Sequence, residues 1–134
     1  MYLSLKEVKL LLTQLERKNL EKYRIAVDIY NRSIKSKDLK GYDDSLLYAQ
    51  ETYGLSKQIA YQYKRACKFL YFDTCTCMLD NKFTITQLVE LSQLWQPIVI
   101  KLYEMGKITH YMTCQEIRNI VKSEKPKQQK NTTL

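Results

Sequence analysis

One helix-start signal occurs three times in this sequence and constrains its fold more than any other feature. It is the capping box, in which Ser or Thr is followed three residues later by Glu or Gln, and flanking apolar residues pack across the first turn. The boxes are Ser4–Glu7, Thr84–Gln87 and Thr113–Glu116, with the flanking pairs Leu3 and Val8, Phe83 and Leu88, and Met112 and Ile117. Only three Gly and two Pro interrupt the chain. We therefore expect an all-α protein, a multi-helix bundle.

The first predicted helix carries an apolar row that changes phase near Lys18 and Asn19. Two arrangements fit this change: one long helix whose row drifts around the axis, or two helices hinged at Asn19. A long first helix could pair with itself in a dimer, or its row could simply cover the core. The row comprises Leu5, Val8, Leu12 and Leu15, and then Leu20, Tyr23, Val27, Tyr30 and Ile34.

Residues 42–70 are predicted to form two helices joined by a tight turn at Gly54. The first should begin at Asp43, with Tyr42 and Leu47 as an apolar clasp. Glycine readily adopts the left-handed conformation that ends many helices, and Ser56 is a good N-cap for the second helix. The expected buried residues are Leu46, Leu47, Ala49 and Tyr53 in the first helix and Ile59, Ala60, Tyr63, Cys67 and Leu70 in the second.

The other face of the second helix is polar and cationic. Two helices with a short glycine-containing turn are typical of a helix-turn-helix, here at about residues 43–70, whose second helix enters the major groove of DNA. A helical hairpin with a solvated polar face is the alternative, and on the hairpin alone the two are about equally supported. The candidate DNA-binding residues are Ser56, Lys57, Gln58, Tyr61, Gln62, Lys64, Arg65 and Lys68.

Aligned on Gly54, this segment resembles the helix-turn-helix of bacterial, phage and plasmid DNA-binding proteins. The phrase GLSKQIAYQYKRA is similar to spirochaete-type plasmid partition and replication proteins and, more distantly, to the ParB helix-turn-helix domain. The later phrase PIVIKLYEMGKIT is similar to the helix that follows the ParB motif. The resemblance implies that the second helix faces DNA. One departure is Gln50, which stands where the family usually has a small residue.

The charge of the chain favours a polyanionic partner. Its 22 Lys and Arg against 14 Asp and Glu give a net charge of +8, and such an excess binds phosphates by releasing counterions. Residues 35–41 are expected to form a basic loop, in which Lys35, Lys37 and Lys40 are candidate phosphate contacts or merely solvated. Residues 1–122 should form a single domain, followed by a disordered basic C-terminal tail at 123–134, which lacks apolar periodicity.

No catalytic constellation is found, so we expect no enzymatic activity and no cofactor. The four cysteines, Cys67, Cys75, Cys77 and Cys114, lack the spacing of a zinc site. We interpret them as reduced thiols, with no metal bound. The sequence contains no membrane-spanning segment or secretion signal, and we expect a cytoplasmic protein that does not bind membranes.

These features predict a protein that binds double-stranded DNA sequence-selectively, in replication, partition or transcriptional control of a plasmid or phage. A homodimer is expected because such proteins commonly pair two half-sites. The alternative is a small phage-type accessory protein whose helical surface binds and inhibits another protein, for example a host defence nuclease. A helix-turn-helix fold can persist without being used on DNA.

Overall fold

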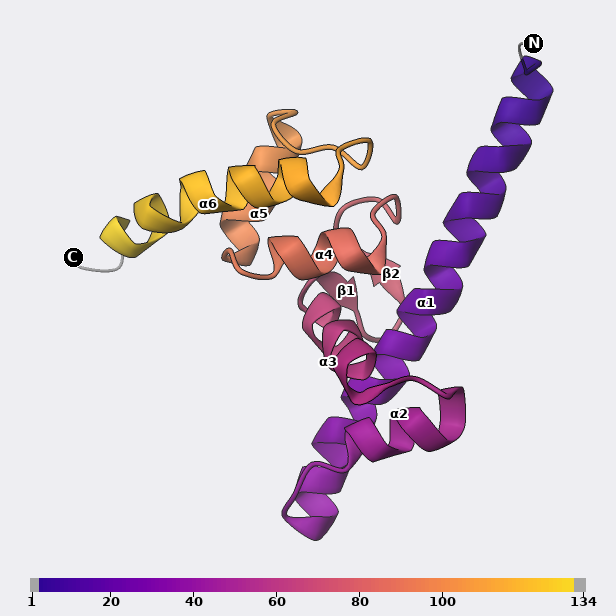
Figure 1. Ribbon diagram of the computed structural model, residues 1–134, viewed down its shortest axis with the longest axis vertical. Helices are drawn as coiled ribbons and strands as arrows, with labels where there is room; N and C mark the ends of the chain where they lie inside the picture. Colours follow the sequence, from indigo (N-terminus) through magenta and orange to yellow (C-terminus); the bar gives the residue numbers. More distant parts are fainter. Residues whose placement is uncertain (1–2, 132–134) are drawn as a thin grey trace.

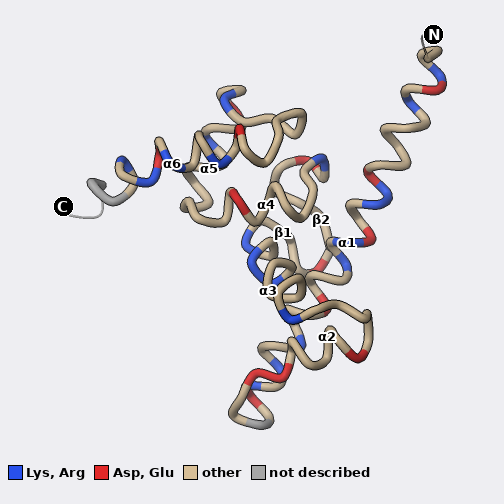
Figure 2. The backbone as a smooth tube through the Cα atoms, in the orientation of Figure 1, with Lys and Arg blue, Asp and Glu red and all other residues tan. Residues whose placement is uncertain are grey.

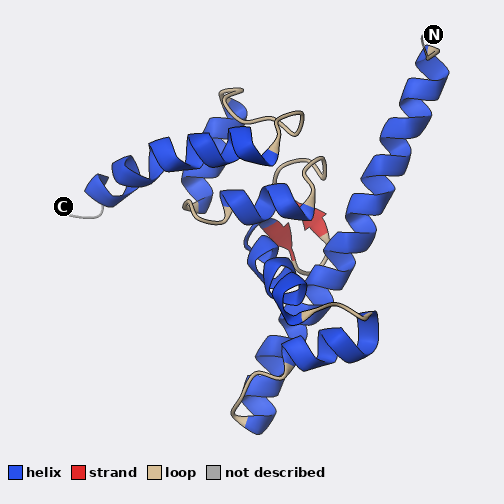
Figure 3. Ribbon diagram, viewed as in Figure 1, coloured by secondary structure: helices blue, strands red, loops and turns tan. Residues whose placement is uncertain are grey.

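Long helix α1 crosses one side of the molecule, and its first half extends beyond the other elements (Figure 1). The computed structural model describes residues 3–131, except for the side chains of residues 40 and 129–131. Helices dominate, and one very short two-stranded sheet accompanies them (Figure 3). In chain order the elements are α1 (Leu5–Lys40), α2 (Ser45–Tyr53), α3 (Lys57–Ala66), the 3-10 helix η1 (Cys67–Phe69), β1 (Leu70–Tyr71), β2 (Thr76–Cys77), α4 (Ile85–Leu91), α5 (Gln96–Glu104) and α6 (Cys114–Asn131).

Helix α1 is continuous, so the alternative of two helices hinged at Asn19 is wrong. It runs for 36 residues and ends at Gly41, which adopts the left-handed conformation (φ 74°) and donates its N–H to the Lys37 carbonyl. The basic loop expected at 35–41 is therefore also wrong, because residues 35–40 are the last turns of this helix. Helix formers without an intervening Gly or Pro let the helix continue to the first glycine.

The core lies where helix α3 packs between α1 and α4, and α6 covers the other side of α4. Small side chains of α1 and α3, including Ala26, Ala60 and Ala66, are fully buried, which lets the helices approach closely. Larger buried residues fill the space around them. Those with no exposure at all include Tyr23, Ile29, Phe69, Leu79, Phe83, Leu88, Leu91, Leu94, Ile108 and Ile117.

The N-cap hydrogen bond of each predicted capping box is present, and the second and third boxes are complete. Thr84 and Gln87 make both reciprocal hydrogen bonds, as do Thr113 and Glu116. Ser4 accepts from the Glu7 N–H and donates to the Glu7 carboxylate. The apolar pairs beside the second and third boxes are at least partly buried, whereas Leu3 and Val8 are exposed. The capping-box pattern therefore predicts where these helices start but not whether the apolar residues beside each start become buried.

The segment after α3 forms a small β-hairpin, which the sequence did not indicate. The helix expected to continue to Leu70 ends at Ala66, and η1 leads into β1. Leu70 pairs with Cys77 and Tyr71 with Thr76 in antiparallel register. Asn81, with a positive φ of 61°, accepts from the Cys77 N–H at 2.6 Å through its side chain. Asn adopts such turns more readily than most residues, which explains its place here.

The disordered tail expected from residue 123 is wrong as far as Asn131, because α6 continues to that residue. Residues 132–134 of the tail lie outside the described part of the chain. The Trp95 N–H donates to Gln128 Oε1 at 2.7 Å, and Lys125 Nζ donates to Gln93 Oε1 at 2.7 Å. The last turns of α6 thus hold the connection between α4 and α5 by polar contacts, which an apolar-periodicity criterion does not detect.

Deleting residues 123–134 should lower the thermal midpoint by about 3–10 °C, because both contacts to residues 93–95 are lost. Gln128→Ala should reproduce part of this loss. Lys127→Ala is the matched control and should change little, since Lys127 forms its ion pair with Glu124 of its own helix. Thermal unfolding followed by circular dichroism measures all three; an unchanged midpoint after the deletion would mean that these contacts do not stabilise the protein.

Candidate nucleic-acid interface

Helices α2 and α3 form a hairpin, which we call the α2–α3 hairpin, with its turn at residues 54–56. Gly54 has a left-handed conformation (φ 69°) and donates to the Gln50 carbonyl, while the Leu55 N–H donates to Ala49. The bond from Gly54 to Gln50 is that of an αL C-cap motif, which satisfies one of the last carbonyls of α2. Ser56 then accepts from the Ile59 N–H at 3.2 Å and starts α3. The predicted glycine turn and serine cap are both confirmed.

The start of the hairpin differs from the expectation in detail. Helix α2 begins at Ser45, with Asp44 in the N-cap position, and Asp43 accepts from the Ser45 N–H at 2.8 Å. Tyr42 and Leu47 are both exposed, so the apolar clasp predicted between them does not exist. The aspartates position this end of the helix instead.

The expected buried face of the hairpin is confirmed in its small and central residues only. Ala49, Ala60, Tyr63, Cys67 and Leu70 are buried. Tyr53 and Ile59, which we expected in the core, are exposed. Tyr53 is the last residue of α2 and Ile59 lies in the first turn of α3, and helical periodicity does not reveal how far neighbouring helices cover such positions.

Asp43 connects three helices and fixes α3 relative to α1. Its carboxylate accepts from Lys64 Nζ and from Ser33 Oγ, both at 2.6 Å. Burial by itself would raise the pKa of Asp43, but the hydrogen bonds from Lys64, Ser33 and Ser45 outweigh it and hold this pKa well below its ordinary value. The carboxylate is therefore charged at neutral pH, and Lys64 is held against it.

A second set of contacts joins α2 to α1. Arg32 makes a bidentate ion pair with Asp44, at 3.0 and 2.9 Å, and its guanidinium lies 5.2 Å from the ring centre of Tyr48. The hydroxyls of Tyr48 and Tyr53 both donate to Asp28. These contacts are side-chain to side-chain across 12 to 25 residues of sequence. They hold the hairpin as one unit on the second half of α1.

The candidate DNA-binding residues differ in exposure and in whether another part of the protein binds them. Lys57, Gln58 and Tyr61, in the first half of α3, are exposed. Gln62 and Arg65 follow on the same side and are partly buried. Ser56 is the N-cap, and Lys64 is held by Asp43. The structure thus brings the polar residues of α3 together at its N-terminal half, where they face solvent.

Lys68 is used to stabilise the fold rather than presented on the surface. Its ammonium donates to the carbonyls of Ser92 and Leu94, at 2.9 and 2.6 Å, which lie directly after α4. A cation is favourable there, because the carbonyls at a helix C-terminus carry partial negative charge. Burial, with a further contribution from Arg65, lowers the pKa of Lys68 below its ordinary value.

A groove of about 960 Å³ adjoins the C-terminal half of α3. Arg65 lines it together with Lys64 and Lys68, opposite the rings of Tyr30 and Phe72, which stack at 4.7 Å between centroids. Figure 2 shows basic residues along α3. The side of α3 next to the exposed polar residues is therefore basic and partly aromatic.

The candidate phosphate contacts lie at the C-terminal end of α1. Lys35 and Lys37 are exposed there, whereas the side chain of Lys40 lies outside the described residues. Because these lysines lie on a helix and not in a loop, the backbone that carries them has a defined direction. Sequence reasoning missed Asp43 and Asp44 as anchors of the hairpin, and their distant partners leave no local pattern by which they could be found.

The cysteines are separate from this interface. Cys67 donates to the Ala26 carbonyl at 3.1 Å, and burial raises the pKa of its thiol to about 12. All four cysteines are free thiols. Among residues 3–131, no three His, Cys, Asp or Glu side chains are grouped so as to hold a metal ion. Within the same residues no helix has the length and apolar character needed to cross a membrane.

Comparisons with protein-family models, with curated proteins and with solved structures found no match to this chain.

Asp43→Asn should lower the free energy of unfolding at pH 7 by about 1–3 kcal/mol, because it leaves Lys64 without its charged partner. Because the pKa of Asp43 is lower in the folded protein than in the unfolded chain, its charged carboxylate stabilises the fold at pH values above the unfolded-state pKa of about 4. This stabilisation is lost as the pH falls below that value. The variant should therefore have a flatter pH dependence of stability below about pH 4. Urea unfolding across this pH range measures it, with Asp38→Asn, an exposed residue of α1, as control; equal pH profiles would contradict the assigned role.

Proposed function

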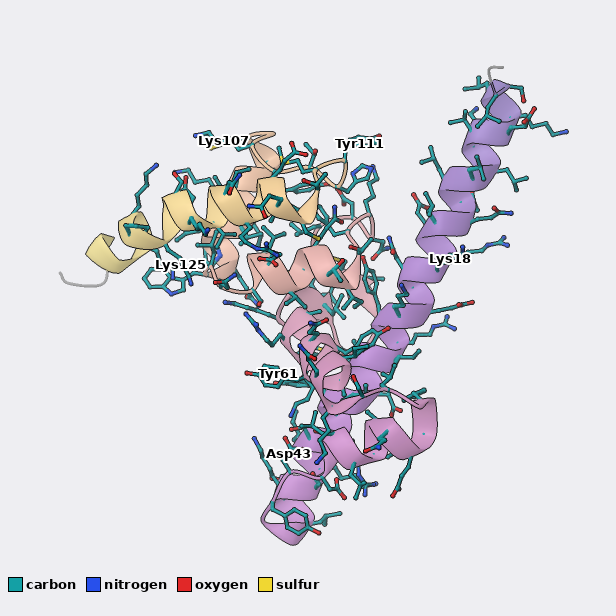
Figure 4. The ribbon with its side chains drawn as sticks, viewed as in Figure 1. Lys18, Asp43, Tyr61, Lys107, Tyr111 and Lys125 are labelled. Atoms are coloured by element: carbon teal, nitrogen blue, oxygen red, sulfur yellow. The ribbon has the colours of Figure 1, made fainter. Side chains whose placement is uncertain are left out.

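We propose that this protein binds double-stranded DNA through the α2–α3 hairpin, with α3 in the major groove. The observation that carries the proposal is the exposure of Lys57, Gln58 and Tyr61 on the N-terminal half of α3, at the start of a helix held by two others. In a helix-turn-helix the N-terminal residues of the second helix contact the bases. Tyr61 extends from the side of α3 into solvent (Figure 4).

The chemistry of these residues suits base reading combined with phosphate binding. The side-chain amide of Gln58 can donate one hydrogen bond to adenine and accept another from it. Arg65 lines the groove beside α3, and its guanidinium can donate two hydrogen bonds to a guanine that reaches the edge of this groove. Lys57 can neutralise a phosphate beside the helix N-terminus. The net charge of +8 supplies attraction to any duplex. Lys64 and Lys68, bound within the protein, are left out of the proposed contact.

The rigidity of the hairpin supports the same function. A helix that reads bases must hold its side chains in a fixed register, because a small displacement removes a bidentate contact. The ion pairs from Arg32 to Asp44 and from Lys64 to Asp43 connect α2 and α3 to α1 on two sides. Together with the resemblance of GLSKQIAYQYKRA to plasmid partition and replication proteins, this favours a role in the replication, partition or transcriptional control of a mobile element.

Gln58→Ala and Arg65→Ala should each weaken binding to a selected duplex by about 1–3 kcal/mol and weaken binding to random duplex much less, because only base contacts distinguish sequences. Lys107→Ala is the control. It removes a cation at the far end of the molecule from α3 (Figure 4), and it should change both affinities about equally. Fluorescence anisotropy at one fixed salt concentration measures the two affinities.

The wild-type protein decides between the two candidate functions. Tighter binding to its best selected duplex than to random duplex supports DNA reading by α3. Equal binding to both would eliminate sequence-selective recognition and leave the inhibitory, protein-binding function as the better interpretation.

A further inference from the structure

The first half of α1 carries large apolar side chains that the other described parts of the chain leave exposed. Leu5 is 71% exposed and Leu15 is 57% exposed, and Leu10, Leu11 and Leu12 between them are exposed as well. This half of the helix extends away from the body (Figure 4). A helix that turns apolar residues to water along three turns is stable only marginally by itself, because most helices gain stability from packing one face.

Four exposed apolar residues of this segment, Val8 among them, form a narrow row of the kind that pairs helices. Leu5, Val8, Leu12 and Leu15 alternate in steps of three and four, which is the spacing of the seam in a coiled coil. Leu10 lies on the opposite side of the helix. The row is therefore a defined surface and not a general excess of leucine.

The row points to the same side of α1 as the body, and it ends where the body begins. Residues eleven apart lie on nearly the same side of a helix, after about three turns. Leu12 and Leu15 are thus in line with Tyr23 and Ala26, which are fully buried. Asn19, between them, donates to the Asn81 carbonyl at 3.2 Å, and Leu20 beside it packs against the core.

We infer that a second copy of this chain covers the row, with the first halves of the two α1 helices packed antiparallel. Parallel pairing is sterically blocked, because a parallel partner helix continuing past Asn19 would occupy the space in which α3 and α4 pack on α1. In the antiparallel arrangement each partner helix ends near the point at which the other body starts. The two bodies then lie at opposite ends of the helix pair.

The free segment has the length and the side chains for this arrangement. Leu5 packs beside Leu15 of the second copy and Val8 beside Leu12 of the second copy, and the two-fold symmetry repeats both contacts. Lys9 and Glu16 lie on one flank of the row, so each copy turns a cation toward the flank that carries the other's anion. Leu11, on the other flank, meets its symmetry mate near the axis. Antiparallel helices place equivalent flanks together, which makes the charges complementary.

A recess at the end of the row offers a place for the second copy's N-terminal turn. It measures about 160 Å³ and lies between Leu12 and Leu15 of α1 and the side chains of His110 and Tyr111. Tyr111 is 79% exposed, although it contacts the His110 ring at 4.0 Å between centroids. An incoming apolar residue such as Leu5 would cover both the recess and this ring. The inference rests on α1 and its surroundings and does not depend on DNA binding.

The test is the mass of the full-length protein in solution without DNA, measured by light scattering coupled to size exclusion. The wild type should have twice the mass of one 16.0 kDa chain. Leu12→Asp together with Leu15→Asp should reduce it to one chain. Leu10→Asp makes the same chemical change in the same segment but outside the row, and it should leave the dimer intact. A monomeric wild type, or a dimer that survives the double substitution, would overturn the proposal.

Charge exchange tests the orientation. Lys9→Glu places acids against acids in the antiparallel pair and should weaken the dimer about two- to tenfold, and adding Glu16→Lys should restore it. In a parallel pair Lys9 would face Ser4, so the exchange would have little effect, and that result would refute the antiparallel arrangement. If Leu10→Asp dissociates the dimer as completely as the double substitution, the row is not the interface. Circular dichroism confirms that each variant retains its helices.

Discussion

Helix α1 is anchored from about Asn19 to its C-terminal end, and the positions of the other helices follow from that anchoring. Tyr23, Ala26 and Ile29 are fully buried on one side of it. Because Ala26 is small, the end of α3 approaches closely enough for Cys67 to donate to the Ala26 carbonyl. Helix α3 is thereby fixed between α1 and α4, and α2 is held at its side. Everything that could recognise a ligand through α3 depends on this close packing.

Features that depend on neighbouring residues could be predicted from the sequence. The three capping boxes, the Gly54 turn and the Ser56 cap each involve residues within about six positions of one another, so the pattern contains the whole interaction. The all-helical character followed from these starts and from the scarcity of Gly and Pro. Helical periodicity also identified Ala60 and Tyr63 as core residues of α3.

Features that depend on distant partners could not be predicted. The extent of α6 is linked to contacts of Lys125 and Gln128 with the α4–α5 connection, about 32 residues earlier. Likewise, Lys64 of α3 and Lys68 of η1 are spaced like solvent-facing cations of one helix, and their acceptors, Asp43 and the carbonyls after α4, remove them from the surface. For α3, the sequence therefore predicted the helix and its Ser56 cap, but not which of the cations remain accessible.

Because Lys64 and Lys68 are bound within the protein, they are withdrawn from the surface that α3 presents to a partner. A cation that caps α4 or joins α3 to α1 cannot release a counterion from DNA, so the attraction contributed by α3 is smaller than its composition implies. The exposed residues of α3 are Lys57, Gln58, Ile59 and Tyr61, of which only Lys57 is charged. Such a surface favours hydrogen bonding to base edges over general attraction, while the cations on other elements supply the attraction.

The two proposals constrain each other through the length of α1. If Leu5 lies beside Leu15 of a second copy, the two Ala26 residues, each next to the end of an α3 helix, are about 32 residues of helix apart, or about 48 Å. Two helix-turn-helix units that share one face of a duplex contact major grooves about 34 Å apart, or a multiple of that distance. This distance separates the C-terminal ends of the two α3 helices and not their exposed N-terminal halves. The direction in which each α3 leaves α1 therefore decides whether the two copies reach adjacent half-sites or bind separate stretches of DNA.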